Sequence, residues 1–288
     1  MKLALGTVQF GLPYGIKNSS GIPIDDDIKQ IFSVAKQAGI EVVDTAIAYG
    51  NAEERIGLHS NGDFKIITKF PSFPEGVEHS YQWLSDTIDG SLNRLKLNKI
   101  HGVLLHRPSQ LLEKEGDLLF KNLQQLKTDG KVDKIGISIY EPSELDALTD
   151  KYKFDIVQAP LNIFDRRLIE TEWLFKLADM RTEVHVRSVF LQGLLLVSPL
   201  QRLSKFDPWS GHLSKYDNWL KETGITALEA CLRFVLSFPE VSNVIIGIDN
   251  CDQLKDIITA AKGDTPLIPV DLSSNDLKLI NPLSWLDF

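Results

Sequence analysis

Short aliphatic stretches alternate with amphipathic ones along the whole chain, and this alternation constrains the fold more than any other feature. Eight short runs are rich in Val, Ile and Leu and show little polar alternation, which is typical of strands buried on both faces of a parallel sheet. These runs are residues 2–6, 40–45, 64–69, 100–106, 133–138, 154–159, 183–188 and 241–247. Helical patterns lie between and after them, at residues 24–39, 81–97, 117–130, 141–152, 226–238 and 250–263.

This pattern predicts an α/β protein built as a single (β/α)8 barrel of the TIM type, for which about 250 residues is a usual length. A doubly wound sheet is the alternative, but no Gly-x-Gly-x-x-Gly follows an early strand to favour it. The 288 residues contain no recognisable linker or low-complexity tract. We therefore expect one domain over residues 1–288, in which residues 264–288 form a C-terminal tail beyond the last helix.

Composition narrows the possible partners and location. The net charge of -8 disfavours a general nucleic-acid surface, which needs a basic face. Cys231 and Cys251 are the only cysteines, too few for a disulfide framework or a four-thiolate zinc site. No apolar run approaches the roughly 18 residues of a membrane span, and no signal-peptide pattern begins the chain. We expect a cytoplasmic protein that binds a small molecule, with no nucleic-acid or membrane partner; the sequence does not reveal its oligomeric state.

Polar residues stand at the ends of six successive predicted strands. In a parallel barrel these ends converge on one face, which is where TIM-barrel active sites lie. Each residue alone has an ordinary explanation, as a strand cap, a surface lysine or a structural histidine. Six in succession indicate a polar site, and its residues are Asp44, Lys69, His106, Ser138, Gln158 and Arg187.

Several segments resemble motifs of the aldo-keto reductases, and together they cover nearly the whole chain. They are "GTVQFG" (6–11), "DTAIAYGNAEERIG" (44–57), "ITKF" (67–70), "LLHRP" (104–108), "GIS" (136–138), "VQAPLN" (157–162), "QGLL" (192–195) and "VIIGIDN" (244–250). Their order and spacing are those of the family, so the chain resembles a bacterial aldo-keto reductase.

The resemblance implies NAD(P)H-dependent reduction of an aldehyde or ketone, with a catalytic group of Asp44, Tyr49, Lys69 and His106. Tyr49 would protonate the carbonyl oxygen while the nicotinamide delivers a hydride. A phenol has an ordinary pKa of about 10, so we expect the Lys69 ammonium, held by Asp44, to lower the pKa of Tyr49. His106 would orient the carbonyl oxygen. Gly50 allows a tight turn after the tyrosine, and Asn51 is suited to cap the next helix.

The resemblance also implies a set of coenzyme contacts. Ser138 and Gln158 would bind the nicotinamide carboxamide, and the planar guanidinium of Arg187 would stack on the ring. Ile139 stands where the family often has Asn, so this position offers no side-chain contact to the carboxamide. The full set is Gly6, Thr7, Ser138, Gln158, Arg187, Ser188, Gln192, Gly193, Gly247, Asp249 and Gln253.

The segment after the last predicted strand departs most from the family. Asp249 and Gln253 stand where polar or basic contacts to the adenosine phosphates are usual, and Asp256-Ile257 replaces a Glu-Asn pair. A carboxylate repels a 2′-phosphate but accepts hydrogen bonds from a ribose diol, although backbone amides at residues 247–250 are able to hold a diphosphate. We expect the coenzyme to be NADPH or NADH with a weak or reversed preference for NADPH. The nearest downstream lysines are Lys255 and Lys262.

Two other functions are open to this sequence. The altered adenosine segment motivates an aldo-keto reductase fold that serves as a regulatory or binding subunit with weak or no catalysis. A metal-dependent barrel hydrolase is disfavoured because paired inward histidines are absent, and no metal site is expected.

Aromatic residues near the carboxyl end bear on the substrate. Aromatic platforms suit sugar-like or flat carbonyl compounds, but loop and helix packing explains such residues equally well. The residues are Trp209, His212, Tyr216 and Trp219 after the seventh strand, and Trp285 and Phe288 in the C-terminal tail.

Overall fold

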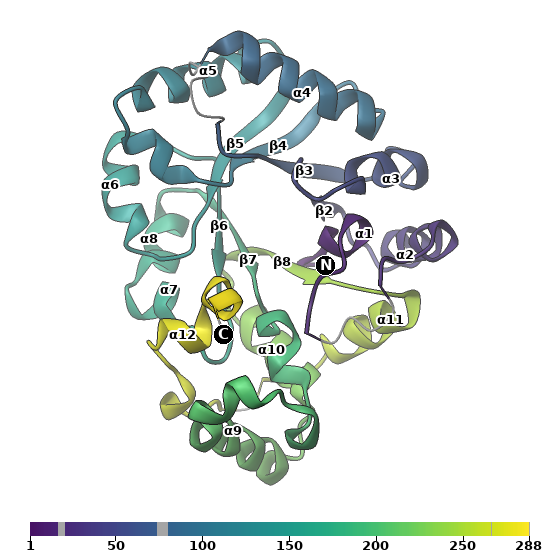
Figure 1. Cartoon of the computed structure of the whole chain (residues 1–288), viewed down its shortest axis with the longest axis vertical. Helices are drawn as coiled ribbons and strands as arrows, with labels where there is room; N and C mark the ends of the chain where they lie inside the picture. The colour runs from purple at the N-terminus through teal and green to yellow at the C-terminus, as the bar shows by residue number, and fades with distance from the viewer. Residues whose placement is uncertain (17–20, 74–79, 266, 288) are drawn as a thin grey trace.

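Eight parallel strands form a closed barrel in which each strand pairs with its neighbour in the sequence and the eighth returns to the first (Figure 1). The computed structural model describes residues 1–16, 21–73, 80–265 and 267–287. The predicted (β/α)8 barrel is therefore confirmed, and each predicted strand is present. The strands are β1 Leu3–Gly6, β2 Val42–Asp44, β3 Lys65–Phe70, β4 Ile100–Leu105, β5 Val132–Ser138, β6 Ile156–Pro160, β7 Glu183–Arg187 and β8 Val241–Gly247.

Helices surround the barrel and bury one apolar face against it. In α2, for example, Ile28, Ile31, Phe32 and Ala35 recur at helical spacing and are buried. The α-helices are α1 Val8–Gly11, α2 Asp25–Gln37, α3 Ala52–His59, α4 Tyr81–Leu95, α5 Gly116–Thr128, α6 Glu144–Lys151, α7 Arg167–Glu170, α8 Trp173–Asp179, α9 Ser210–Thr223, α10 Ala227–Leu236, α11 Cys251–Ala260 and α12 Leu277–Ile280.

The helix starts show which side chains act as caps. Thr226 and Glu229 form a reciprocal capping box at the start of α10, and Asn250 accepts a hydrogen bond from the Gln253 amide at the start of α11. Asn51 precedes α3 but its side chain makes no capping bond. The expectation that Asn51 caps this helix was wrong, because its backbone has ψ near 20° rather than the extended conformation of a typical N-cap.

The barrel interior is filled by an apolar layer, and the next layer toward the carboxyl ends is polar. Because strand side chains alternate, a residue two positions beyond an inward residue also points inward. The apolar layer is Ala4, Val42, Ile67, Leu104, Ile156 and Ile245. Two residues further along these strands, and at the ends of β5 and β7, stand Gly6, Asp44, Lys69, His106, Ser138, Gln158, Arg187 and Gly247. Each strand thus contributes one residue to a layer at the carboxyl end.

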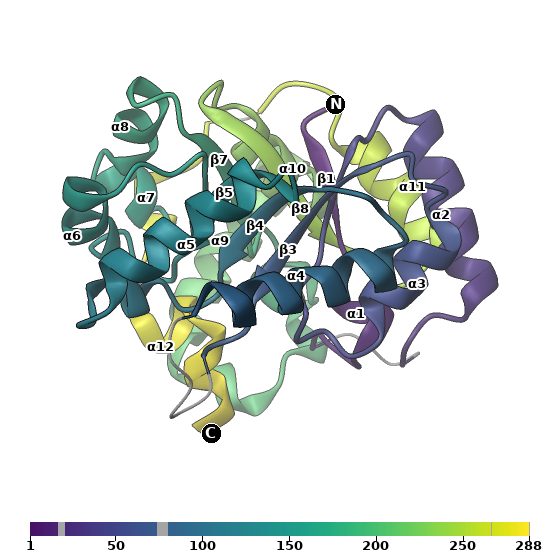
Figure 2. The same ribbon diagram turned by 90° about the horizontal axis from the view of Figure 1, so that it is seen from above.

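The C-terminal tail is folded against the barrel rather than extended. It contains α12 and two short 3-10 helices, Val270–Leu272 and Pro282–Asp287. It packs against the segment after β7, where Trp209 donates a hydrogen bond to Asp276 and the Phe206 and Trp285 rings are 4.9 Å apart. In Figure 2, α12 and the C-terminus lie on the same side of the barrel as α1, which follows β1. Residues 266 and 288 of the tail lie outside the described residues.

Within the described ranges, no helix combines the length and apolar character needed to cross a membrane.

Candidate active site

A cavity of about 740 Å³ opens at the carboxyl ends of the strands. Its wall includes every residue that the sequence analysis assigned to the site except Lys69, which lies behind it. The elements that contribute are the strand ends, the segments after β1 and β7, the start of α11 and the C-terminal tail. The strand order therefore brings residues from distant parts of the sequence to one cavity.

A buried ion pair forms the floor of the site. Lys69 Nζ donates to Asp44 Oδ1 at 2.5 Å and to the Thr45 carbonyl oxygen at 3.0 Å. The two side chains are 1% and 5% exposed, and such a pair is stable only when both charges are hydrogen-bonded. Burial lowers the pKa of Lys69, and the Asp44 carboxylate opposes this by favouring the ammonium.

The second oxygen of Asp44 is held from across the barrel. Gln158 Nε2 on β6 donates to Asp44 Oδ2 at 2.7 Å, and the Gln158 side chain is buried. On β5, Ser138 Oγ donates to Gln158 Oε1 at 3.4 Å. The carboxamide residues expected from sequence thus also belong to the network of the Lys69–Asp44 pair.

Tyr49 is presented to the cavity by a turn that requires two glycines. Gly50 has φ of 56°, and a Cβ there would lie 2.5 Å from the Gly11 carbonyl oxygen. A Cβ on Gly11 would lie 1.9 Å from the Tyr49 carbonyl oxygen, so the two backbone segments pack too closely for any side chain. The Tyr49 ring is 5.4 Å from Lys69 Nζ and 6.0 Å from the His106 ring.

The pKa of Tyr49 is raised above the ordinary phenol value, chiefly because burial disfavours the phenolate. The Asp44 carboxylate raises it further, whereas Arg187 lowers it. The expected lowering of the Tyr49 pKa was therefore wrong. Burial and the Asp44 carboxylate together outweigh the cations near the ring.

His106, directly after β4, faces the cavity as a neutral imidazole. Burial lowers its pKa to about 4, and the nearby Lys69 charge acts in the same direction. At neutral pH one ring nitrogen is a hydrogen-bond donor and the other an acceptor.

Arg187 is fixed at the end of β7 by three contacts. It donates to the Ile139 carbonyl oxygen at 2.9 Å and to Ser188 Oγ at 3.1 Å, and it lies 4.4 Å from the Tyr140 ring centroid. Ile139 has no side-chain amide, and it is fully buried in the core and does not line the cavity. Tyr140 stacks on the guanidinium that was expected to stack on a nicotinamide.

The segment after β7 is strained and crosses toward the segment after β1. Ser188, Leu191 and Gln192 all have positive φ, which is costly for residues with side chains and is common at functional sites. Gln192 Nε2 donates to the Tyr14 hydroxyl at 2.8 Å, and the Ile16 amide donates to the Gln192 carbonyl oxygen at 3.1 Å. Two chain segments far apart in sequence therefore meet at the cavity mouth.

The opposite end of the cavity is acidic. Asp249 accepts from Gln253 Nε2 at 3.4 Å, while the Asp249 amide donates to Gln253 Oε1 at 2.9 Å. Burial raises the pKa of Asp249. Lys255 pairs with Asp252 on the exposed side of α11 and is not part of the cavity wall, and neither is Lys262. Among the described residues that line the cavity, the cations are Arg187 and Lys205.

One buried acceptor on the wall lacks a partner. Gln9 Oε1 makes no hydrogen bond, and the Gln9 side chain lies against Gly247, where a Cβ would approach it to 2.4 Å. Gln9 was not predicted as a site residue, although it lies within the "GTVQFG" segment, because it does not directly follow a strand. Such an orphan acceptor in a polar cavity suits a ligand hydroxyl.

The structure adds several wall residues to the predicted set. Tyr140 comes two positions after Ser138, so strand alternation was a usable signal for it. Tyr14, Lys205 and Trp285 come from irregular segments whose positions depend on tertiary packing. Of the other predicted aromatics, Tyr216 and Trp219 are buried core residues, and Trp209 and His212 bond the C-terminal tail.

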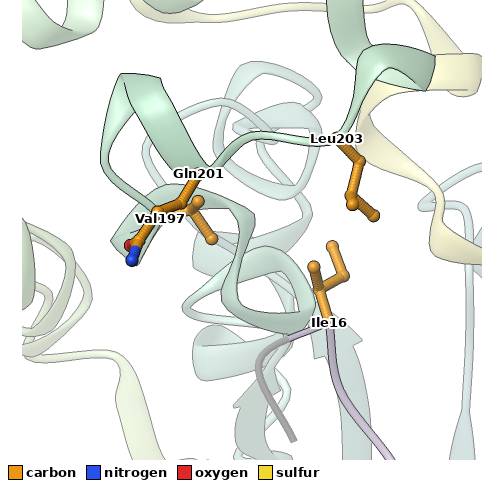
Figure 3. A pocket seen from close by; sticks show the side chains of 4 residues that line it. All are labelled: Ile16, Val197, Gln201 and Leu203. Carbon is orange, nitrogen blue, oxygen red and sulfur yellow. The ribbon is translucent and has the colours of Figure 1, made fainter. Parts of the chain in front are cut away.

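A second, smaller pocket adjoins the cavity mouth, and its lining contains no ionisable or nucleophilic side chain. Figure 3 shows Leu203 and Ile16 pointing toward each other, with Val197 and Gln201 nearby. It has a volume of about 340 Å³, and only Gln201 in its lining is polar. Among the described residues, no group of three or more His, Cys, Asp or Glu side chains is placed to hold a metal ion.

Comparison with known proteins gives consistent matches. The sequence model described as the aldo/keto reductase family matches residues 2–268. An uncharacterised oxidoreductase, YqkF, from Bacillus subtilis is 27% identical over an alignment of 251 residues that covers 80% of this chain and 81% of that protein. A putative aldo-keto reductase from Pseudomonas aeruginosa superposes with a TM-score of 0.66 at 25% identity, covering 90% of this chain and 89% of that one. The fold is also that of the aldo-keto reductase AKR11C1 from Bacillus halodurans, with a TM-score of 0.73 at 22% identity over 92% of this chain and 88% of the other.

Proposed function

The chain belongs to the aldo/keto reductase family, and on this basis we propose that it reduces an aldehyde or ketone to an alcohol with NADH or NADPH. One observation carries the proposal. Tyr49 and His106 line one cavity, and the buried Lys69–Asp44 pair lies beside the tyrosine ring. A proton donor, a neutral hydrogen-bond donor and a fixed charge pair are the groups that carbonyl reduction needs from the protein.

In this proposal Tyr49 gives its proton to the substrate oxygen. Its raised pKa keeps the phenol protonated at neutral pH, and a phenol is still a far stronger acid than the alcohol that forms. The positive charges of Lys69 and Arg187 stabilise the tyrosinate that remains. Asp44 acts through Lys69, which it holds in place by the 2.5 Å hydrogen bond.

His106 orients the carbonyl group and shares in stabilising the negative charge that develops on its oxygen. A neutral imidazole suits this role because its N–H donates without competing with Tyr49 as the proton source. The Tyr49 and His106 ring centroids are 6.0 Å apart and both residues line the cavity, so one small group there could contact both side chains.

The residues present fit a nicotinamide coenzyme. The cavity wall offers polar groups both at the strand ends and at the start of α11, and the Gln9 acceptor that lacks a partner lies against Gly247, which has no side chain of its own. When bound, the coenzyme supplies the hydride. Ser138 and Gln158 would bind its carboxamide, Arg187 would lie against the ring, and the adenosine end would meet Asp249 and Gln253. The remaining contacts would come from Gly6, Thr7, Ser188, Gln192, Gly193 and Gly247.

The acidic adenosine end should weaken or reverse the family's usual preference for NADPH. Asp249, Gln253 and Asp256 lie on the wall there, and both nearby lysines are off it. A carboxylate accepts hydrogen bonds from the 2′-hydroxyl of the ribose, as in other dinucleotide sites.

Small carbonyl compounds, including sugar-like ones, are the proposed substrates. Tyr14, Tyr140 and Trp285 give the cavity aromatic surfaces with polar edges.

Coenzyme titration together with turnover tests the proposal. Protein fluorescence is followed as NADH or NADPH is added, and loss of the reduced nicotinamide is then measured with a panel of aldehydes and ketones. Saturable binding below millimolar and turnover that disappears in Lys69→Met would support a reductase. The alternative function, a regulatory or binding subunit, is motivated by the altered residues Asp249 and Gln253. It would be favoured if neither coenzyme binds below millimolar.

A further inference from the structure

Gln158 joins the coenzyme side of the cavity to the buried ion pair. Its side chain is 1% exposed, and it reaches from β6 across the barrel to β2. One end of the amide donates to Asp44 Oδ2 at 2.7 Å, and the other accepts from Ser138 at 3.4 Å. The shorter contact is the one to the charged group.

We propose that Gln158 is a positioning residue that acts through Asp44, in addition to any contact with a coenzyme. The geometry divides the carboxylate between two donors: Lys69 holds Oδ1 and Gln158 holds Oδ2. With both oxygens engaged, the carboxylate plane is fixed. A fixed carboxylate in turn fixes Lys69 Nζ, which lies 5.4 Å from the Tyr49 ring.

Burial makes the second donor important. Asp44 is 4% exposed, so water does not replace a lost hydrogen bond as it would at the surface. An ionised buried carboxylate with one unsatisfied oxygen rotates or draws its neighbours toward it, because the missing donor is costly. Lys69 also bonds the Thr45 carbonyl oxygen at 3.0 Å, so a rotated Asp44 would leave the ammonium closer to that carbonyl and differently placed from Tyr49.

This inference rests on the proposed reductase function for its effect on rate, but the contact itself does not depend on it. A coenzyme carboxamide can use the second N–H of Gln158 or the second lone pair of Oε1, since the first N–H is given to Asp44 and Oε1 already accepts from Ser138. The two roles therefore predict different results. Loss of a carboxamide contact weakens coenzyme binding, whereas loss of the Asp44 contact lowers kcat.

A double-mutant cycle separates the two roles. Gln158→Met preserves length and approximate volume but removes both hydrogen bonds, and Asp44→Asn removes the charge on which Gln158 is proposed to act. We expect Gln158→Met to lower kcat about 10- to 100-fold in the wild-type background, the usual worth of a hydrogen bond to a charged group. In the Asp44→Asn background the same change should lower kcat less than threefold. Any effect on the coenzyme Kd should be equal in both backgrounds.

A matched control and an activity-independent readout complete the test. Gln110→Met alters another buried glutamine, outside the cavity wall, and should leave kcat unchanged. The 13Cε resonance of Lys69, assigned from its loss in Lys69→Met, should move in Gln158→Met without any coenzyme and stay in place in Gln110→Met. Gln158→Leu replaces Gln158→Met if the latter does not fold.

Equal losses of kcat in both backgrounds, or an unmoved Lys69 resonance, would overturn the positioning role. If the wild-type protein reduces no carbonyl compound, the proposed function fails instead, and the Lys69 resonance alone decides whether Gln158 positions the pair.

Discussion

At the scale of single residues, the candidate site places a buried phenol, that of Tyr49, beside the buried Lys69–Asp44 ion pair. Burial and Asp44 raise the pKa of Tyr49, and Arg187 is the cation that lowers it. In the proposed reaction, the tyrosine therefore stays protonated until negative charge appears on a substrate oxygen. Acid catalysis by Tyr49 would then depend on where the proton donor lies more than on a low pKa.

Tyr49→Phe tests the proton donor directly. The ring and its packing remain, and only the hydroxyl is lost, so coenzyme binding should be almost unchanged. We expect kcat to fall on the order of 10²-fold or more, as for removal of a general acid. Steady-state kinetics and coenzyme fluorescence on the same preparation provide the measurement. A rate within a few-fold of wild type would show that another group donates the proton.

His106 makes a prediction about stability and pH. Its pKa is about 4 in the folded protein against an ordinary 6.5, so between these values the unfolded chain binds more protons at this residue. The contribution of neutral His106 to the free energy of unfolding is therefore fully present above pH 6.5 and is lost as the pH falls toward 4. Compared with His106→Gln, the wild type should lose additional free energy of unfolding over this window. The loss is at most about 3 kcal/mol and is reduced by solvent screening of this partly exposed ring.

Urea unfolding of both proteins at several pH values measures the difference. Other titrating groups are common to the two proteins and cancel. Parallel curves from pH 7 down to pH 4 would mean that His106 is not buried enough to exclude a proton.

At the scale of elements, strand alternation explains why so much of the site could be predicted. At β2, β3, β4 and β6, the polar residue at the strand end follows an inward apolar residue by two positions, as Asp44 follows Val42 and Lys69 follows Ile67. Residues on irregular segments lack such a rule. Tyr14, Lys205 and Trp285 reach the wall because two loops and the C-terminal tail pack together, and no local pattern in the sequence encodes that packing.

The side-chain partners also could not be read from the sequence. Gln158 and Asp44 are 114 positions apart and meet only because the barrel closes. The pKa direction of Tyr49 failed for the same reason, since it depends on how far burial outweighs Lys69. The sequence could predict which charged residues stand at the strand ends. It could not predict the net effect of their charges and of burial on the pKa of a side chain inside the site.

The close approach of α1 to the turn after β2 gives a prediction at this scale. A Cβ on Gly11 would lie 1.9 Å from the Tyr49 carbonyl oxygen and 2.9 Å from the Ala52 amide, both of them backbone atoms. Gly11→Ala should therefore displace the turn, lower kcat, and destabilise the fold by about 2–4 kcal/mol. Gly211→Ala in α9 is the matched control, because nothing lies within 4 Å of its Cβ. It should raise the stability only slightly, by less than about 1 kcal/mol, because Gly211 lies in the first turn of α9 rather than in its middle. Equal effects of the two changes on the midpoint of thermal unfolding would show that α1 has room to move.

At the scale of the whole molecule, the segment after β7 and the C-terminal tail form one cover over the strand ends. Lys215 pairs with Asp271, Trp209 bonds Asp276, and Lys205 donates to the Trp285 carbonyl oxygen. Figure 1 shows the yellow tail beside the green α9. The barrel thus supplies the polar layer, and these two segments supply much of the aromatic wall.

The negative charge of the whole molecule and of its cavity should affect which coenzyme the protein uses. The chain has a net charge of -8, and Asp249 and Asp256 stand at the end of the cavity where the adenosine would lie. The 2′-phosphate of NADPH adds about two negative charges. A like charge in a partly buried site costs about 1–3 kcal/mol, so kcat/KM for NADPH should not exceed that for NADH by more than about tenfold. Asp249→Arg should raise the NADPH to NADH ratio about 10- to 100-fold.

Salt concentration provides an independent check of this electrostatic cause. Raising the ionic strength screens the repulsion of the phosphate, so the wild-type ratio should rise with salt and that of Asp249→Arg should fall. A hundredfold preference of the wild type for NADPH would mean that a cation reaches the phosphate. Lys205 would then be the candidate, because Lys255 is paired on the surface and Lys205 lines the cavity. If Asp249→Arg leaves the ratio unchanged, Asp249 lies outside the adenosine pocket, and the acidic end of the cavity does not determine which coenzyme the protein uses.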